Sequence, residues 1–215
     1  MVFSSITFLL YFLPPFLLAY RLGGAKFQNT ILLFASVVFY GWGAMSFLPI
    51  LLASSVVNFY LVRKLHLMGG VGRGRAVGVA VILNVGILLY FKYANFFVEN
   101  FAPQGFAWED VALPIGISFF SFQSLSYALD VHRKTVRPLD KLSEYLVYIL
   151  SFPQMIAGPI VRFTEVEKEL RNRTVENSDW LFGFYRFTLG LSKKVLIANS
   201  LAAIFPIDVA VISGG

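Results

Sequence analysis

The chain has 215 residues, of which 57% are hydrophobic and only 14% are charged, and its mean hydropathy is +0.70. Soluble domains carry about 25% charged residues, so this composition excludes an ordinary soluble protein and indicates an integral membrane protein. The net charge of +6 does not indicate nucleic-acid binding, because the basic residues lie between apolar runs and not in one patch. The absence of cysteine excludes disulfides and thiolate metal sites.

The first apolar segment, residues 2–20, is interpreted as a retained span and not as a signal peptide. No basic region precedes it and no small-residue cleavage site follows it, while Pro14 and Pro15 are expected to kink it. About 20 apolar helical residues cross a bilayer core of about 30 Å, so the pattern predicts an all-α, polytopic transmembrane helical bundle. Its candidate spans are Ile6–Leu22, Thr30–Trp42, Phe47–Val62, Ala76–Phe91, Val111–Leu129, Tyr145–Val161 and Trp180–Phe205.

The basic residues of the connections alternate in phase with these spans. The connections 21–28, 63–75 and 131–141 hold ten of them, whereas the connections 43–46 and 92–110 hold only Lys92. The positive-inside rule therefore predicts an N-terminus outside the membrane and basic loops in the cytoplasm. Attraction of these loops to anionic membrane lipid is a secondary expectation.

The path of the chain after Leu129 carries a different prediction. Segment 162–176 mixes four basic with four acidic residues and is interpreted as an exposed, ion-paired helix on the cytoplasmic side. If both flanks of 142–161 are cytoplasmic, that segment enters and leaves the membrane on one side, as a re-entrant element. A full crossing is the alternative. The glycine-rich run 69–74 lacks the strand and the acidic residue of a dinucleotide site, so it is interpreted as a flexible basic loop.

Two irregular segments, 113–124 (LPIGISFFSFQS) and 151–162 (SFPQMIAGPIVR), are the strongest candidates for a site. Lipid cannot satisfy a broken backbone, so such segments indicate a polar cavity within the bilayer. Serines at membrane depth commonly join helices, but the larger amide of Gln123 is harder to bury without a cavity. The candidate cavity-lining residues here are Ser118, Gln123, Pro153, Gln154, Gly158, Pro159 and Arg162.

Three basic residues at the end of an apolar run or inside one each have two possible roles. Arg162 is either an anchor at the interface or a fork-shaped donor to a phosphate or carboxylate. Lys193 and Lys194 interrupt an apolar segment and point about 100° apart on a helix. Either this segment lies along the cytoplasmic surface or the lysines line a polar passage. The first interpretation is favoured, and attraction to anionic lipid or a phosphorylated cofactor would add to it.

The two histidines carry no clear chemical signal. His66 and His132 lie among Arg and Lys residues in basic connections, and both are interpreted as solvated residues at the interface. The sequence shows no metal-ligand cluster, nucleophile elbow or pair of carboxylates.

Four blocks of the chain resemble the membrane-bound O-acyltransferase superfamily, and most closely its alginate O-acetyltransferase branch. They are 1–5 (MVFSS), 113–127, 151–162 and 190–198 (GLSKKVLIA), in the family's order and approximate spacing. The resemblance implies a ring of transmembrane helices around a funnel, with re-entrant pieces, in the inner membrane. It also implies transfer of an acetyl group from acetyl-coenzyme A, or a carrier derived from it, to a polysaccharide hydroxyl, together with periplasmic partner proteins.

The family's catalytic histidine belongs to a region that follows these blocks, and neither His66 nor His132 matches its position. In relatives, the position of His132 is commonly Tyr. The resemblance thus implies that residues 1–215 are the N-terminal part of one acyltransferase domain, inactive without its C-terminal half. A transporter half is an alternative, although no acidic residue for ion coupling occurs between Thr30 and Phe91. A non-catalytic membrane scaffold is a further alternative.

Overall fold

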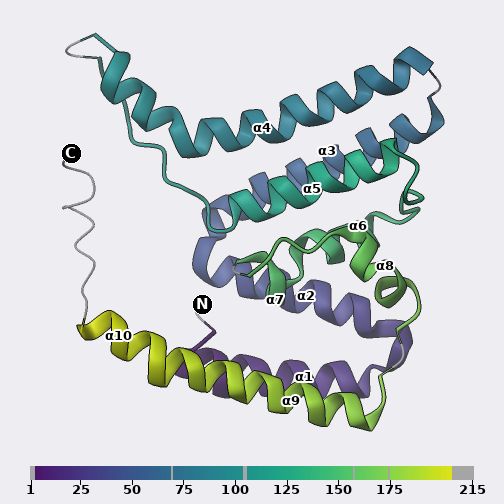
Figure 1. Cartoon of the computed structure of the whole chain (residues 1–215), viewed down its shortest axis with the longest axis vertical. Helices are drawn as coiled ribbons and strands as arrows, with labels where there is room; N and C mark the ends of the chain where they lie inside the picture. Colours follow the sequence, from purple (N-terminus) through teal and green to yellow (C-terminus); the bar gives the residue numbers. More distant parts are fainter. Residues whose placement is uncertain (1–2, 69, 104–105, 157, 174, 205–215) are drawn as a thin grey trace. The chain divides into compact units, whose positions relative to one another are not determined.

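The structure, a computed structural model, describes residues 3–68, 70–103, 106–156, 158–173 and 175–204 (Figure 1). The described residues form helices and connections with no strand, which confirms the all-α prediction. The chain divides into two compact units. The large unit is Phe16–Arg173, and the terminal unit joins Met1–Pro15 to Thr174–Gly215.

The terminal unit combines the first turns of the chain with its last described helices. A π-helical stretch, Thr7–Phe12, leads into α1 (Leu13–Leu22), of which only the first three residues belong to this unit. Pro14 and Pro15 lie two and three residues after the π-helical stretch, and prolines and π-bulges are both recognised causes of helix kinks. The C-terminal part of the unit consists of α9 (Asn177–Ser192), a π-helical stretch (Lys193–Ala198) and α10 (Asn199–Ile204). The expected end of the last span, at Phe205, lies outside the described residues.

The large unit is built on three long helices. They are α2 (Gly24–Ala44), α3 (Leu48–Leu67) and α4 (Gly70–Phe101), and a short 3₁₀ turn, Met45–Phe47, joins the first two. The remaining helices are α5 (Ile117–His132), α6 (Leu142–Leu150), α7 (Phe152–Met155) and α8 (Phe163–Arg171). Figure 1 shows α5 beside α3 and α4, and α6 packs on α2.

Among the described residues, two helical stretches are long and apolar enough to cross a membrane. They are Gly24–Leu67, which contains α2 and α3, with a mean hydropathy of 1.9, and Gly74–Phe101, with a mean hydropathy of 1.8. Thr7–Leu22 is a shorter apolar helix. These findings are compatible with a membrane protein, and they support fewer spans than the sequence predicted.

The glycine-rich run is helical and not a loop, so that prediction was wrong. Its described residues begin α4, which also continues ten residues beyond the predicted end at Phe91. Glycine lowers helix stability by roughly 1 kcal/mol per residue but does not forbid a helix. The polar residues after Phe91 do not stop the helix either. It ends just before Pro103, where the residue preceding proline is disfavoured in a helix.

A buried pair of asparagines joins α3 to α4. The Asn84 amide donates to Asn58 Oδ1 at 2.7 Å, and the Asn58 amide donates to Asn84 Oδ1 at 3.2 Å. Each amide also donates to the carbonyl four residues earlier, so both are fully used. Hydrogen bonds of this kind fix which faces of two apolar helices meet.

Candidate functional site

The two irregular segments meet at Gly116, the residue before α5. Gly116 has φ +79°, in the left-handed region that glycine adopts readily. A Cβ atom added to Gly116 would lie 2.7 Å from the carbonyl oxygen of Met155, which ends α7. The glycine therefore allows the backbone of 113–116 to lie directly against the backbone of the 151–162 segment.

The helix after this contact begins later than predicted. The expected span Val111–Leu129 begins as a helix only at Ile117, because Pro114 and Gly116 keep the preceding backbone irregular. Residues 117–124 of the first segment are regular helix. The irregularity predicted for 113–124 is therefore confined to its first four residues.

One face of α5 carries polar groups into the interior. The Gln123 side chain is fully buried, and neither its Oε1 nor its Nε2 has a hydrogen-bond partner among the described residues. The buried Ser121 hydroxyl also has none among them. A buried polar atom without a partner costs about 1–3 kcal/mol, so such atoms are rare in the absence of a functional reason.

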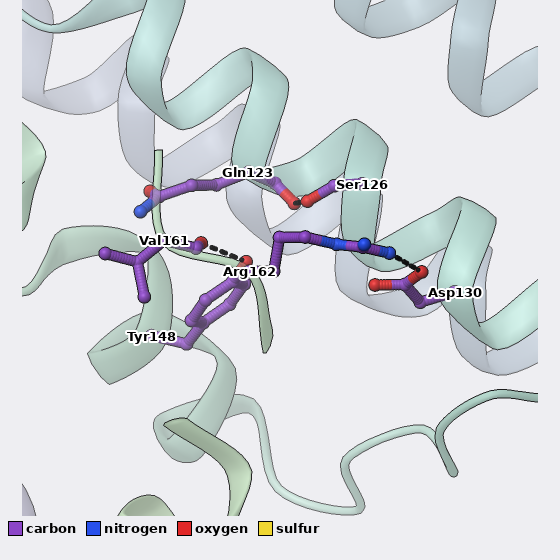
Figure 2. A network of polar contacts seen from close by, with 6 residues as sticks. All are labelled: Gln123, Ser126, Asp130, Tyr148, Val161 and Arg162. Carbon is purple, nitrogen blue, oxygen red and sulfur yellow. Dashed lines mark hydrogen bonds and ion pairs between the residues drawn. The ribbon is translucent and has the colours of Figure 1, made fainter. Parts of the chain in front are cut away.

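An ion pair fastens the end of the 151–162 segment to α5. Arg162 Nη2 lies 2.6 Å from Asp130 Oδ1, and Figure 2 shows the guanidinium directed at that carboxylate. Asp130 is 1% exposed, whereas the Arg162 side chain is 51% exposed. Asp130 lies seven residues, or two helical turns, after Gln123, so both side chains leave the same face of α5.

Tyrosines and a glutamine hold the rest of the segment. The Tyr148 hydroxyl donates to the Val161 carbonyl at 3.1 Å, as Figure 2 shows, and Gln154 Nε2 donates to the Tyr148 carbonyl at 2.7 Å. The Tyr145 hydroxyl donates to Ser124 Oγ at 3.1 Å. The ring of Tyr127 packs at 5.0 Å from the ring of Phe163. Side chains therefore define the path of the segment although its backbone leaves regular helix.

The predicted break in the 145–161 span is confirmed. The helix α6 ends at Leu150, and the single turn α7 ends at Met155. Gly158 lies outside any helix with φ +108°. Gly158, Pro159 and Ile160 are nevertheless exposed, so the large unit by itself does not provide the shelter that the sequence predicts for them.

The other candidate residues are dispersed. Gln154 is half-buried, Pro153 is exposed, and Ser118 is half-buried in the first turn of α5. Lys193 and Lys194 are exposed and belong to the terminal unit. Of the candidate residues, Gln123 and Arg162 lie where α5 faces the 151–162 segment (Figure 2), and we call this the α5 contact.

One residue of the α5 contact, Asp130, was missed at the level of sequence. Asp130 was not considered, although an acidic residue in the apolar run 128–131 requires a partner when buried. Arg162 was interpreted either as an anchor at the interface or as a donor to a phosphate or carboxylate, and the structure pairs it with the carboxylate of Asp130. Its exposed part remains free to meet solvent.

The histidines differ from each other. His66 is exposed in the last turn of α3, in agreement with its interpretation. His132 ends α5 and is half-buried, and its Nδ1 is enclosed without a partner among the described residues. The interpretation of His132 as a solvated residue therefore holds only in part.

Sequence comparison identifies relatives over nearly the whole chain. The probable alginate O-acetylase AlgI of Pseudomonas aeruginosa is 38% identical over 213 residues, which are 95% of this chain and 41% of that protein. The protein of the same name from Azotobacter vinelandii is 38% identical, covering 95% of this chain and 43% of that protein. The peptidoglycan O-acetyltransferase of Helicobacter pylori is 29% identical, covering 94% of this chain and 45% of that protein. No family model and no solved structure matches the chain.

These relatives define a class, the membrane-bound O-acyltransferases, and confirm the resemblance of the four blocks. Within that class, the chain is a homologue of the alginate O-acetylases over 95% of its length. The chain spans less than half the length of the curated relatives it matches.

Proposed function

We propose that the chain forms the N-terminal part of a membrane-bound O-acetyltransferase that acetylates hydroxyls of an extracellular, alginate-type polysaccharide. The observation that carries this proposal is the α5 contact. The two motif segments that resemble the family meet there, with the Gln123 amide buried and unpartnered among the described residues. The names of the relatives support the acyl-transfer chemistry.

In this proposal the donor is acetyl-coenzyme A, or an acetyl carrier derived from it. A base from outside this chain takes the proton of the acceptor hydroxyl, the hydroxyl oxygen attacks the acetyl carbonyl, and the donor thiolate leaves. The Gln123 amide can donate to the donor carbonyl or accept from the acceptor hydroxyl. Neither His66 nor His132 is assigned to the reaction.

The proposed assembly includes more than this chain. The exposed Gly158, Pro159 and Ile160 require shelter within a bilayer, and the C-terminal half of the longer protein supplies it. Membrane lipid, the polysaccharide acceptor and periplasmic acetylation proteins are the other partners, and nucleic acid is not among them.

The proposed membrane path has the N-terminus outside an inner membrane, several spans and a re-entrant segment at 142–161. With 21 and 20 residues, α2 and α3 are each about 30 Å long, enough to cross a bilayer core. Lys141→Cys and Thr164→Cys flank the re-entrant segment, and both positions are exposed. We expect an impermeant thiol reagent to label both from the cytoplasmic side only. Labelling of the two cysteines from opposite sides would show a full crossing instead.

A chimera tests the proposed activity. The matched part of the Pseudomonas aeruginosa relative is replaced by residues 1–215, and acetyl esters are measured on alginate in cells that lack the native protein. We expect acetylation by the chimera and none by purified 1–215 alone with acetyl-coenzyme A and polymer. Acetylation by 1–215 alone would contradict the assignment of the base to the other half.

Gln123→Met separates a structural role from a functional one. Methionine has a similar volume and no unpaired amide, so we expect the free energy of unfolding of the chain to rise by about 1 kcal/mol. In the chimera, we expect acetylation to fall at least about tenfold, because one hydrogen bond to the reacting groups is lost. Phe122→Leu, at an exposed position on the same helix, is the control and is expected to leave both quantities nearly unchanged. Full activity of Gln123→Met would remove Gln123 from the proposed site.

A further inference from the structure

The terminal unit contains a hollow with two cationic residues in its wall. Its volume is ≈ 240 Å³. Arg186, Gly190 and Lys194 line it from α9 and the π-helical stretch after it. The other lining residues are Phe3, Ser4, Phe187 and Leu191. The hollow is therefore cationic on one wall and apolar around it.

Helix geometry explains why these residues share one wall. Arg186, Gly190 and Lys194 follow one another at intervals of four residues, which places them in a row along one side of the helix. An added Cβ on Gly190 would have no atom within 4 Å, so the glycine leaves space between the two cations. Helix α9 changes to π-helical geometry at Lys193, and such changes are frequent at functional sites.

The charge of this wall is not balanced by the helix that carries it. The sequence has no acidic residue between 180 and 204, where Arg186, Lys193 and Lys194 all lie. The nearest described carboxylates of the unit, Glu176 and Asp179, cap the start of α9. Asp179 is seven residues before Arg186, which is about 10 Å along a helix. Among the described residues, neither Arg186 nor Lys194 forms an ion pair.

We propose that this hollow binds a phosphate group. Two cations four residues either side of a glycine match a multiply charged anion, and the arginine can donate two parallel hydrogen bonds to phosphate oxygens. The apolar rim made by Phe3, Phe187 and Leu191 suits a phosphate that carries an apolar or acyl-bearing part. An anionic phospholipid headgroup and a soluble phosphate compound are the two sources of this chemistry. The proposal is independent of whether the chain takes part in acetyl transfer.

Adjacent lysines provide a matched pair of variants. Both lysines are exposed, but only Lys194 lines the hollow. Lys194→Gln and Lys193→Gln remove the same charge from neighbouring positions. A second pair tests space without charge: Gly190→Leu fills the hollow, and Gly183→Leu adds the same side chain to α9 away from it.

The experiment uses the full chain in nanodiscs of phosphatidylcholine with a minority of phosphatidylglycerol, and measures retained lipid by native mass spectrometry. A second arm titrates the chain in neutral detergent with pyrophosphate. We expect Lys194→Gln and Gly190→Leu to weaken binding about tenfold or more, as for loss of one charge-assisted hydrogen bond. We expect Lys193→Gln and Gly183→Leu to change it less than about twofold.

The arms distinguish the source of the phosphate. Retention of phosphatidylglycerol without pyrophosphate binding identifies a headgroup site, and pyrophosphate binding identifies a site for a soluble phosphate. Equal losses in Lys193→Gln and Lys194→Gln would overturn the proposal in favour of general charge attraction. Absence of binding in both arms with the unaltered chain would also overturn it, and circular dichroism of each variant checks that α9 still forms.

Discussion

Gly116→Ala is expected to lower the free energy of unfolding of the chain by about 3 kcal/mol. Two costs add at this position. An alanine at φ +79° carries a left-handed backbone penalty of about 1–2 kcal/mol, and its Cβ would meet the Met155 carbonyl oxygen at 2.7 Å. Relief of that overlap requires the 151–162 segment to move away from α5, which costs about 1–3 kcal/mol more.

Two other glycines separate these costs. Gly158 also has a positive φ, +108°, but no atom lies within 4 Å of an added Cβ, so Gly158→Ala should lose only about 1–2 kcal/mol. Gly86 is in the interior of α4 with free space around it, and Gly86→Ala should gain up to about 1 kcal/mol. Unfolding by dodecyl sulfate in mixed micelles, followed by circular dichroism, ranks the three variants. A Gly116→Ala chain no less stable than Gly158→Ala would show that the two segments do not meet.

The long helices could be predicted from the sequence because hydropathy over about 20 residues depends on composition alone. The ends of these helices could not be predicted in the same way. A helix continues for as long as its backbone hydrogen bonds are satisfied, whatever the polarity of its surface. The helix α4 shows this, running from Gly70 through the apolar centre to Phe101. Where proline and left-handed glycine intervene, as at Pro114 and Gly116, the local signal was present but was outweighed by the apolar run.

The sequence predicted which two segments form the site, but not how their residues pair. The sequence identified 113–124 and 151–162, and the break at Gly158 follows from the Gly-Pro pair in an apolar run. The partner of each polar residue could not be predicted, because pairing depends on which faces of two helices meet. Asp130 and Arg162 are 32 residues apart, and the sequence around either residue does not identify the other as its partner. A buried acid on an apolar helix nevertheless predicts that a cation lies nearby.

The ion pair between Asp130 and Arg162 fixes the register of the α5 contact. Apolar helices slide against one another at little cost, because one apolar surface resembles another. A charge pair and a few hydrogen bonds admit one register only. The Tyr148 hydroxyl fixes Val161, and Asp130 fixes the next residue, Arg162. The segment therefore has a defined position relative to Gln123 although its only regular helix is the single turn α7.

Arg162→Ala is expected to destabilise the chain by about 2 kcal/mol, more than Asp130→Ala. Loss of the arginine leaves the Asp130 carboxylate, 1% exposed, without its cation, whereas loss of the aspartate leaves an arginine side chain that is 51% exposed and reaches solvent. Breaking a fully buried pair costs about 3–5 kcal/mol, and the exposure of Arg162 reduces this figure. The double variant should be more stable than Arg162→Ala alone, with a coupling energy of about 1–2 kcal/mol.

Arg171→Ala is the matched control for this cycle. Arg171 pairs with Glu167 at 3.3 Å within α8, both side chains are about one-third exposed, and such pairs contribute less than about 1 kcal/mol. Unfolding free energies of the four members of the cycle and of the control are measured under one set of micelle conditions. If Arg162→Ala costs no more than Arg171→Ala, the ion pair does not hold the 151–162 segment. Because a misplaced segment would also move away from Gln123, acetylation by the corresponding chimeras should fall in the same order as stability.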